Sequence, residues 1–291
     1  MTDIKTRSID ANGLRFTIDE AGEGDDVALL LHGFPEGRQA WRSQTPALVE
    51  MGWRVVAPDL RGYAESSRPE RRKAYHIHHL TADVAAMFDA VGAKRRLLVG
   101  HDWGGIIAWA AAALRVTPLD GLIVMNAPHP TVYGKLVKRS LQQMMASWYV
   151  MFFQLPWLPE AALKAGRANA VKQAFLRNSR NPAAFPADVL EAYRANIMKP
   201  GAATAMINYY RANTRLVWDI RPEQKIETPT LLIWGEEDFA LNIKLTEGNG
   251  DFVSDFALVR IPGASHWVQY DAAARVNAAM TEWMTAKGLV R

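Results

Sequence analysis

Short runs of consecutive apolar residues alternate with segments of helical spacing over most of the chain. A continuous apolar run of strand length is typical of a strand buried on both faces of a parallel sheet. Apolar residues that recur every three to four positions instead indicate a helix that buries one face. The alternation of the two patterns predicts a parallel sheet covered by helices. The expected strands are 27–31, 53–57, 96–100, 122–125, 230–234 and 257–261, and the expected helices are 40–51, 77–91, a helix that begins at Gly104, and 272–285.

The chain opens with a predicted β-hairpin. Residues 7–11 and 14–19 are compatible with strands, and Asn12-Gly13 stands between them. Asn-Gly is a strong signal for a two-residue hairpin turn, because both turn positions need a positive φ. We therefore expect a hairpin before the first buried strand.

The alternation stops in the middle of the chain and later resumes. Residues 131–221 contain helix-like stretches separated by prolines and no run typical of a buried strand. The fold class that this pattern predicts is α/β, with one mostly parallel sheet and helices on both of its faces. We expect residues 1–130 and 222–291 to form the core and residues 131–221 to form a helical cap inserted between two of its strands.

Composition narrows the class of protein. Of 291 residues, 49% are hydrophobic and 22% are charged, which indicates a large core and excludes disorder. The formal net charge is only +4, and no motif or basic stripe predicts nucleic-acid binding. No apolar run approaches the roughly 18 residues of a membrane span, and the first ten residues lack the apolar segment of a signal peptide. We expect a cytoplasmic protein without a membrane partner, and the sequence carries no signal for an oligomeric state.

Two features bear on metals and cofactors. The chain contains no cysteine, which excludes thiolate metal sites and a cysteine nucleophile. His76, His78 and His79 are close in sequence, but a helix would place them on different faces, and no carboxylate cluster accompanies them. We expect no metal site.

The most informative segment is Leu-Leu-Val-Gly-His-Asp-Trp-Gly-Gly at 97–105. A buried strand there runs through a glycine-rich turn directly into a helix, which is the pattern of a nucleophile elbow. The nucleophile position holds Asp102. A carboxylate that attacks a saturated carbon makes an alkyl ester, and water can cleave this ester at its carbonyl. Asp102 therefore indicates epoxides or alkyl halides as substrates and argues against esters, lipids and peptides.

An ester on Asp102 needs a base that activates water. His266 follows the last expected strand, where this architecture places its histidine. Asp238, after the strand at 230–234, is the best candidate for the carboxylate that orients His266, with Glu236 and Glu237 as competitors. The other position for such an acid, after the strand at 122–125, holds the uncharged Asn126.

The loop His-Gly-Phe-Pro-Glu at 32–36 supplies the expected oxyanion hole. Its backbone N–H at Phe34, together with that of Trp103, would hold the ester carbonyl oxygen. The Phe34-Pro35 bond is a candidate for a cis peptide.

Five segments together resemble the epoxide hydrolases of the α/β-hydrolase fold. They are His-Gly-Phe-Pro-Glu at 32–36, Trp41-Arg42, Asp-Leu-Arg-Gly-Tyr at 59–63, Gly-His-Asp-Trp-Gly-Gly at 100–105, and His266-Trp267. The resemblance covers nearly the whole chain and departs from the family pattern at Ala64, where glycine is usual. It implies the α/β-hydrolase fold, no cofactor, and conversion of a small apolar epoxide and water to a vicinal diol.

The same resemblance implies two tyrosines in the cap that donate hydrogen bonds to the epoxide oxygen. Tyr149 matches the first of these positions and Tyr210 the second, with Tyr209 ranked below it. An epoxide leaves as an alkoxide, a poor leaving group that needs a proton donor such as a phenol. We also expect Trp148, Met151, Tyr209 and Trp267 to line the substrate pocket, although the Trp and Met residues of the cap would serve equally well as its own core.

Two other classes of function stay open on the sequence, a dehalogenase and a non-catalytic module. A haloalkane dehalogenase resembles this chain in the Trp after the nucleophile but commonly has Asn in place of Phe34. A haloacid dehalogenase resembles it in the 32–36 loop but places Arg at the position of Trp103, and that arginine would anchor the acid. A non-catalytic ligand-binding or receptor module of this fold would keep the pocket and could lose the triad, whereas all three triad positions are filled here.

Overall fold

The computed structural model describes residues 2–214 and 225–290 and confirms the α/β fold class. Eight strands form one sheet in the order β1-β2-β4-β3-β5-β6-β7-β8. The pairs β1·β2 and β2·β4 are antiparallel, and every other neighbouring pair is parallel. The strands are β1 (Lys5–Ala11), β2 (Leu14–Ala21), β3 (Asp26–Leu31), β4 (Arg54–Pro58), β5 (Arg95–His101), β6 (Gly121–Met125), β7 (Thr230–Gly235) and β8 (Phe256–Ile261).

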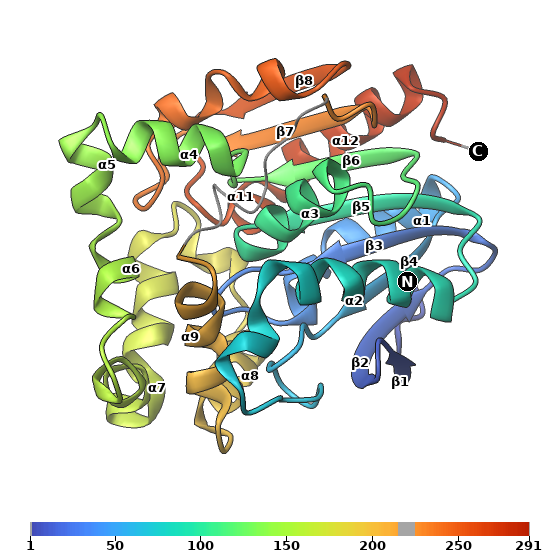
Figure 1. Ribbon diagram of the computed structural model, residues 1–291. Coiled ribbons are helices and arrows are strands. Elements are labelled where there is room, and N and C mark those ends of the chain that lie inside the picture. The colour runs from blue at the N-terminus through green and yellow to red at the C-terminus, as the bar shows by residue number, and fades with distance from the viewer. Residues whose placement is uncertain (1, 215–224, 291) are drawn as a thin grey trace.

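Helices cover both faces of the sheet (Figure 1). The α-helices of the core are α1 (Gln44–Glu50), α2 (Ile77–Ala90), α3 (Trp103–Ala113), α11 (Val268–Asp271) and α12 (Ala273–Ala286). Helix α2 packs against α3, and α1 packs against α12. Short 3-10 helices join these elements: η1 (Arg38–Trp41), η2 (Arg72–Tyr75), η4 (Ile243–Thr246) and η5 (Asn249–Phe252).

The predicted hairpin and all six predicted strands are present, each within a few residues of its expected ends. The helical stretch expected at 40–51 is present but divided in two. The chain first forms η1, and α1 begins only at Gln44, two residues before Pro46. Proline fits the first turn of a helix but would break the interior of one that began at Ala40.

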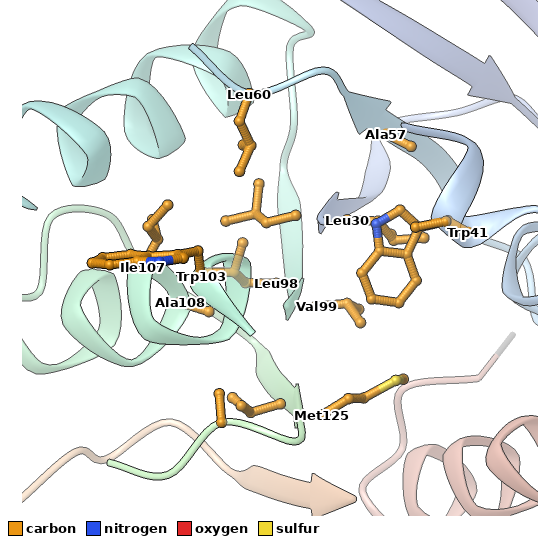
Figure 2. Packing of buried hydrophobic residues seen from close by; sticks show 14 of the residues in the cluster. Leu30, Trp41, Ala57, Leu60, Leu98, Val99, Trp103, Ile107, Ala108 and Met125 are labelled. Atoms are coloured by element: carbon orange, nitrogen blue, oxygen red, sulfur yellow. The ribbon is translucent and has the colours of Figure 1, made fainter. Parts of the chain in front are cut away.

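The core beside the elbow fills both sides of β5 (Figure 2). Successive side chains of a strand point to opposite faces, and Leu98 and Val99 are both fully buried. Val99, the register partner of Leu30, points toward Trp41, and Leu98 points to the opposite side, toward α3. The strand that carries the nucleophile is thus held by apolar contacts on both faces, which fixes the position of its carboxyl end.

A group of helices follows β6 and lies beyond the carboxyl ends of the parallel strands, at the left of Figure 1. This group is α4 (Pro130–Val137), α5 (Leu141–Ala146), α6 (Trp148–Phe152), α7 (Leu158–Asn178), η3 (Pro182–Ala184), α8 (Ala187–Met198) and α9 (Ala202–Ala212). The division of the chain into a core and a cap at 131–221 stays a prediction, and its boundary at 221/222 lies outside the described residues. In residues 2–214 and 225–290, no helix combines the length and the apolar character needed to cross a membrane.

Two side-chain amides connect this group of helices to segments outside it. Gln143 of α5 donates to the carbonyl oxygen of Ala240 (3.0 Å) and accepts from the N–H of Asn242 (2.8 Å). Asn213, after α9, accepts from the N–H of Ile77 (2.8 Å) and donates to the carbonyl oxygen of Tyr75 (2.8 Å). Both amides are buried, so these hydrogen bonds hold the cap in one position over the sheet.

Candidate active site

The elbow places Asp102 between β5 and α3 in a conformation that few residues adopt. Its φ is 50° and its ψ is −118°, a sparsely populated combination for a residue with a side chain. A Cβ added to Gly104 would lie 2.0 Å from the carbonyl oxygen of Leu31, and one added to Gly100 would lie 2.3 Å from that of Gly104. Only glycine fits at these two positions, and the turn therefore holds the Asp102 side chain at the edge of the sheet.

The loop after β3 approaches Asp102 closely. The N–H of Phe34 donates to Asp102 Oδ1 at 2.7 Å. A Cβ on Gly33 would lie 2.5 Å from the Cβ of Asp102, so glycine is required for the backbone to pass. The Phe34-Pro35 peptide is cis, as the sequence suggested. Trp103 is the first residue of α3, so its N–H is one of the donors that a helix leaves unpaired at its N-terminus.

His266 lies between two carboxylates. Its Nδ1 is 2.7 Å from Asp238 Oδ2, and its Nε2 is 3.6 Å from Asp102 Oδ2. The first distance is that of a strong hydrogen bond, and the second leaves the imidazole close to Asp102 without a direct bond. The structure thus brings together the three residues that the sequence proposed as nucleophile, acid and base.

Asp238 alone of the three candidate acids reaches His266. Glu237 forms an ion pair with Arg180 at 2.5 Å, and Glu236 is exposed. The side chain of Asp238 is fully buried, and its Oδ1 accepts hydrogen bonds from the N–H groups of Ala240 (2.8 Å) and Leu241 (2.9 Å). These bonds fix the carboxylate that faces the imidazole.

Asn126 holds the other oxygen of that carboxylate, a contact that the sequence analysis missed. Its Nδ2 donates to Asp238 Oδ2 at 2.8 Å, and its Oδ1 accepts from the N–H of Gly235 at 2.9 Å. Sequence reasoning treated Asn126 only as an acid position without its charge. In the structure, the amide connects the end of β6 to the loop that carries Asp238.

The charges of the three residues depend on one another. Burial opposes ionisation of Asp102, but the nearby His266 and the Phe34 N–H outweigh it and hold the pKa of Asp102 below its ordinary value. Burial also opposes protonation of His266, yet the carboxylates of Asp238 and Asp102 raise the pKa of His266 well above its usual value. Both carboxylates therefore favour the protonated form of the imidazole.

A buried polar network behind the nucleophile was also missed from the sequence. Glu36 Oε2 lies 2.8 Å from His101 Nδ1 and accepts from the N–H of Gly33 at 2.9 Å. Gln269 Nε2 donates to Glu36 Oε1 at 3.0 Å, and His101 Nε2 lies 2.9 Å from the carbonyl oxygen of His266. The network connects the 32–36 loop, the elbow and the histidine loop. Its only sequence signal is the placement of Glu36 and His101 inside two motifs of the site.

Tyr149 and Tyr210 belong to two of the helices that follow β6 and line the same cavities as Asp102. Tyr149 belongs to α6 and Tyr210 to α9, and their ring centroids lie 5.9 Å apart at an angle of 86°. The Tyr210 ring is held edge-on by Phe34 and Trp103, at 5.5 and 5.0 Å. Burial raises the pKa of both Tyr149 and Tyr210 well above 10. Both phenols therefore stay protonated at neutral pH and can donate hydrogen bonds.

Two cavities, of about 180 and about 420 Å³, meet at this point. Asp102, Tyr149 and Tyr210 line both of them. Most of the other lining side chains are apolar, and the described residues that line the two cavities include no lysine or arginine. An apolar molecule that spans the junction would place its middle against the carboxylate and the two phenols.

The predicted pocket residues fall into two groups. Trp148 and Trp267 line the larger cavity. Tyr209 is fully buried outside the lining of both cavities, and its hydroxyl donates to the carbonyl oxygen of Arg61 at 2.8 Å. Met151 is 72% exposed and lines neither cavity. We therefore leave Tyr209 and Met151 out of the site, because neither side chain reaches the space beside Asp102.

A metal site has no support in the described part of the chain, where no group of three or more His, Asp or Glu side chains is placed to hold an ion. The rings of His76 and His78 lie 5.1 Å apart, without such a group around them.

Comparison with known proteins identifies the family. The family of the alpha/beta hydrolase fold matches residues 27–273. The chain is 38% identical over 274 residues to human Epoxide hydrolase 4, covering 91% of this chain and 74% of that protein. It is 34% identical over 314 residues to Epoxide hydrolase A of Mycobacterium tuberculosis, covering 96% of this chain and 97% of that protein.

A solved structure shows the same likeness in three dimensions. It is that of a mutant epoxide hydrolase from Bacillus megaterium complexed with its product, a naphthyloxy-propane-1,2-diol. The TM-score is 0.87 at 27% identity, and the match covers 96% of this chain and 100% of that chain. By its sequence, its fold and these relatives, the chain belongs to the α/β-hydrolase fold family and, within it, to the epoxide hydrolases.

Proposed function

We propose that this protein opens an apolar epoxide by attack of Asp102 and releases a vicinal diol after hydrolysis of the ester. One observation carries the proposal: Asp102, Tyr149 and Tyr210 are the three residues that line both of two apolar cavities. A carboxylate nucleophile and two neutral donors that line one space fit a ring that is attacked at carbon while its oxygen leaves.

In the first step, Asp102 Oδ2 attacks a ring carbon, and the carbon–oxygen bond of the ring breaks. Oδ1 already accepts from the Phe34 N–H at 2.7 Å, so Oδ2 is the oxygen that is free to attack. The emerging alkoxide takes a proton from the Tyr149–Tyr210 pair, so the oxygen leaves as a neutral hydroxyl group. The product of this step is a neutral alkyl ester on Asp102.

In the second step, His266 activates water against the ester carbon. Esterification removes the negative charge of Asp102, one of the two carboxylates that hold the pKa of His266 high. The pKa of His266 then falls. A protonated His266 can therefore return a proton to the tyrosine pair, which gave one to the alkoxide, and the neutral imidazole that remains can act as a base. Water adds to Cγ while the N–H groups of Phe34 and Trp103 hold the negative charge that forms on Oδ1. The bond from Cγ to Oδ2 breaks, Oδ2 takes the proton that His266 accepted from water, and the diol leaves with Oδ2.

The cavities support neutral, apolar epoxides over haloacids. A haloacid carries a carboxylate that needs a cationic partner, and the described lining residues include no lysine or arginine. The unequal cavities also support an epoxide with one short and one longer apolar substituent. The cytoplasmic location expected from the sequence stays a prediction, which fractionation of the host cell would test.

A substrate panel tests the proposal directly. The protein is incubated side by side with aryl epoxides, alkyl epoxides, haloalkanes and haloacids, and diol and halide are measured. We expect diol from at least one epoxide class and turnover of haloalkanes and haloacids at least 100-fold slower. Halide release without diol from any epoxide would contradict the proposal and support a dehalogenase. Binding of epoxides without turnover would support a receptor module.

Replacement of Tyr149 or Tyr210 by phenylalanine is expected to lower kcat for an epoxide by roughly 100-fold, the lower range for loss of a general acid. The Tyr149→Phe/Tyr210→Phe double variant is expected to lose more, because no phenol is left for the alkoxide. Steady-state kinetics of diol formation measure both effects.

Tyr209→Phe is the matched control for this pair. It removes the same hydroxyl from the same helix as Tyr210→Phe, but from a side chain that donates to Arg61 and does not line the cavities. We expect a loss of stability of about 1 kcal/mol, the value of one hydrogen bond, with kcat within about threefold of the unchanged protein. Equal losses of kcat in all three single variants would contradict the role of Tyr149 and Tyr210 as the proton donors.

A further inference from the structure

Exposed apolar side chains gather on one short segment of the cap. Residues 141–158, here termed the apolar rim, hold eight of the eleven large hydrophobic residues that are exposed in the described chain. Trp157 is 74% exposed, Met151 72%, Met145 65% and Trp148 64%. Helix α6 contributes no buried residue at all. Single exposed apolar residues are ordinary, but eight of them within residues 141–158 indicate a surface that binds something.

The same part of the chain is strongly basic. Residues 130–178, from α4 to the end of α7, contain seven lysines and arginines and one acid, a net charge of +6, whereas the rest of the chain carries −2. The one acid, Glu160, forms an ion pair with Arg211 of α9 at 2.5 Å. Lys138 and Arg139 precede the rim, and Lys164 and Arg167 follow it. A wide apolar surface with basic residues at both ends is typical of helices that lie in a membrane interface.

We propose that the apolar rim docks this protein on the surface of an anionic lipid bilayer. Its Trp and Met side chains enter the boundary between headgroups and acyl chains, where amphipathic aromatic rings are favoured. The flanking lysines and arginines contact the acidic headgroups and keep their charge in the aqueous layer. This is peripheral docking and needs no membrane-spanning helix.

The position of the rim relative to the larger cavity supports this occupant. Figure 1 places α5, α6 and the start of α7 along the outer edge of the cap, away from the sheet. Trp148 is both a rim residue and a lining residue of the larger cavity, which Phe152 and Leu163 also line. If the proposed function holds, a docked protein would receive apolar epoxides directly from the bilayer in which they dissolve.

The charge of the segment argues against a second copy of the chain as the occupant. A symmetric dimer joins the same surface of both copies, so it would bring two segments of net charge +6 together. Like charges at an interface cost several kcal/mol. An anionic bilayer covers the apolar side chains and also neutralises the basic ones.

Sedimentation with lipid vesicles tests docking without any epoxide, so its result does not depend on the proposed function. We expect the protein to sediment with vesicles of phosphatidylcholine containing 30% phosphatidylglycerol, and at least tenfold more weakly with pure phosphatidylcholine or in 0.5 M NaCl. The Met145→Gln/Met151→Gln/Trp157→Gln variant is expected to bind at least tenfold more weakly. Its control, Ile4→Gln/Met198→Gln, removes exposed apolar residues outside the rim and is expected to bind within twofold of the unchanged protein.

A second pair of variants tests the charge. Arg139→Gln/Lys164→Gln is expected to lower binding to the anionic vesicles about tenfold or more. The control Lys94→Gln/Arg275→Gln removes the same charge from the core and is expected to bind within twofold of the unchanged protein.

The three rim substitutions lie outside both cavities. An unchanged Tm and unchanged turnover of a water-soluble epoxide therefore show that the triple rim variant is folded. Equal binding to charged and neutral vesicles, or none to either, would overturn the proposal. The proposal would also be overturned if the protein formed a dimer in lipid-free solution and the triple rim variant did not.

Discussion

Asp102→Ala is expected to lower epoxide turnover by about 10⁴-fold or more, because alanine has no oxygen that can attack the ring carbon. Loss of a covalent nucleophile in an enzyme of known mechanism has effects of this order or larger. Steady-state diol formation at saturating epoxide measures the loss. The remaining interactions of the pocket with epoxide stay in place, so we expect the variant still to bind the substrate.

Thermal unfolding must be followed in the same variant, because Asp102 has a φ of 50°. Aspartate already bears the backbone strain of this φ and alanine would bear it too, so we expect the variant to stay folded and to unfold in a cooperative transition. Activity within tenfold of the unchanged protein, with a folded variant, would show that another group opens the ring.

His266→Gln is expected to convert the protein from a catalyst into a reagent that reacts once. Asp102 can still open the ring, but no base activates water, so the ester accumulates. Intact-mass spectrometry after mixing with epoxide is expected to show one adduct of the mass of the epoxide, and fragmentation is expected to place it on Asp102. Steady-state turnover should fall by roughly 10³-fold or more.

Two controls separate this outcome from nonspecific alkylation. The Asp102→Ala/His266→Gln variant should gain no mass, because it lacks the nucleophile. His78→Gln removes an exposed histidine of α2 and should turn over normally. An adduct on any other residue, or turnover near that of the unchanged protein, would contradict the role of His266 as base.

Local patterns were sufficient to predict the sheet. The runs of 27–31 and 97–100 are continuous and apolar, and in the strands β3 and β5 these residues are buried on both faces. The elbow was predictable for the same reason, because three glycines around Asp102 describe a local geometry. The helical stretch at 40–51 is divided into η1 and α1, because Pro46 is compatible only with the first turn of a helix.

Contacts between distant segments were not predictable in this way. Gln269 and Glu36 are 233 residues apart in sequence and meet at 3.0 Å, and no local spacing encodes that contact. Asn126 was assigned to the correct place but without its partner, since only the fold brings it to Asp238. The exposure of Met151 is of the same kind: an apolar residue in a helix carries no sign of whether the neighbouring helices will cover it.

The position of the cap in the chain affects the order in which the site is completed. Strands β6 and β7 are neighbours in the sheet, although the whole series of helices from α4 to α9 separates them in the sequence. A long insertion is cheap for a folded protein, since each doubling of a loop costs only about 0.6 kcal/mol. On the ribosome, however, the strands up to β6 and the nucleophile emerge well before β7, β8 and His266. An incomplete chain therefore contains Asp102, the proposed nucleophile, but not His266, the proposed base. Diol formation consequently requires that synthesis and folding have reached the last strands.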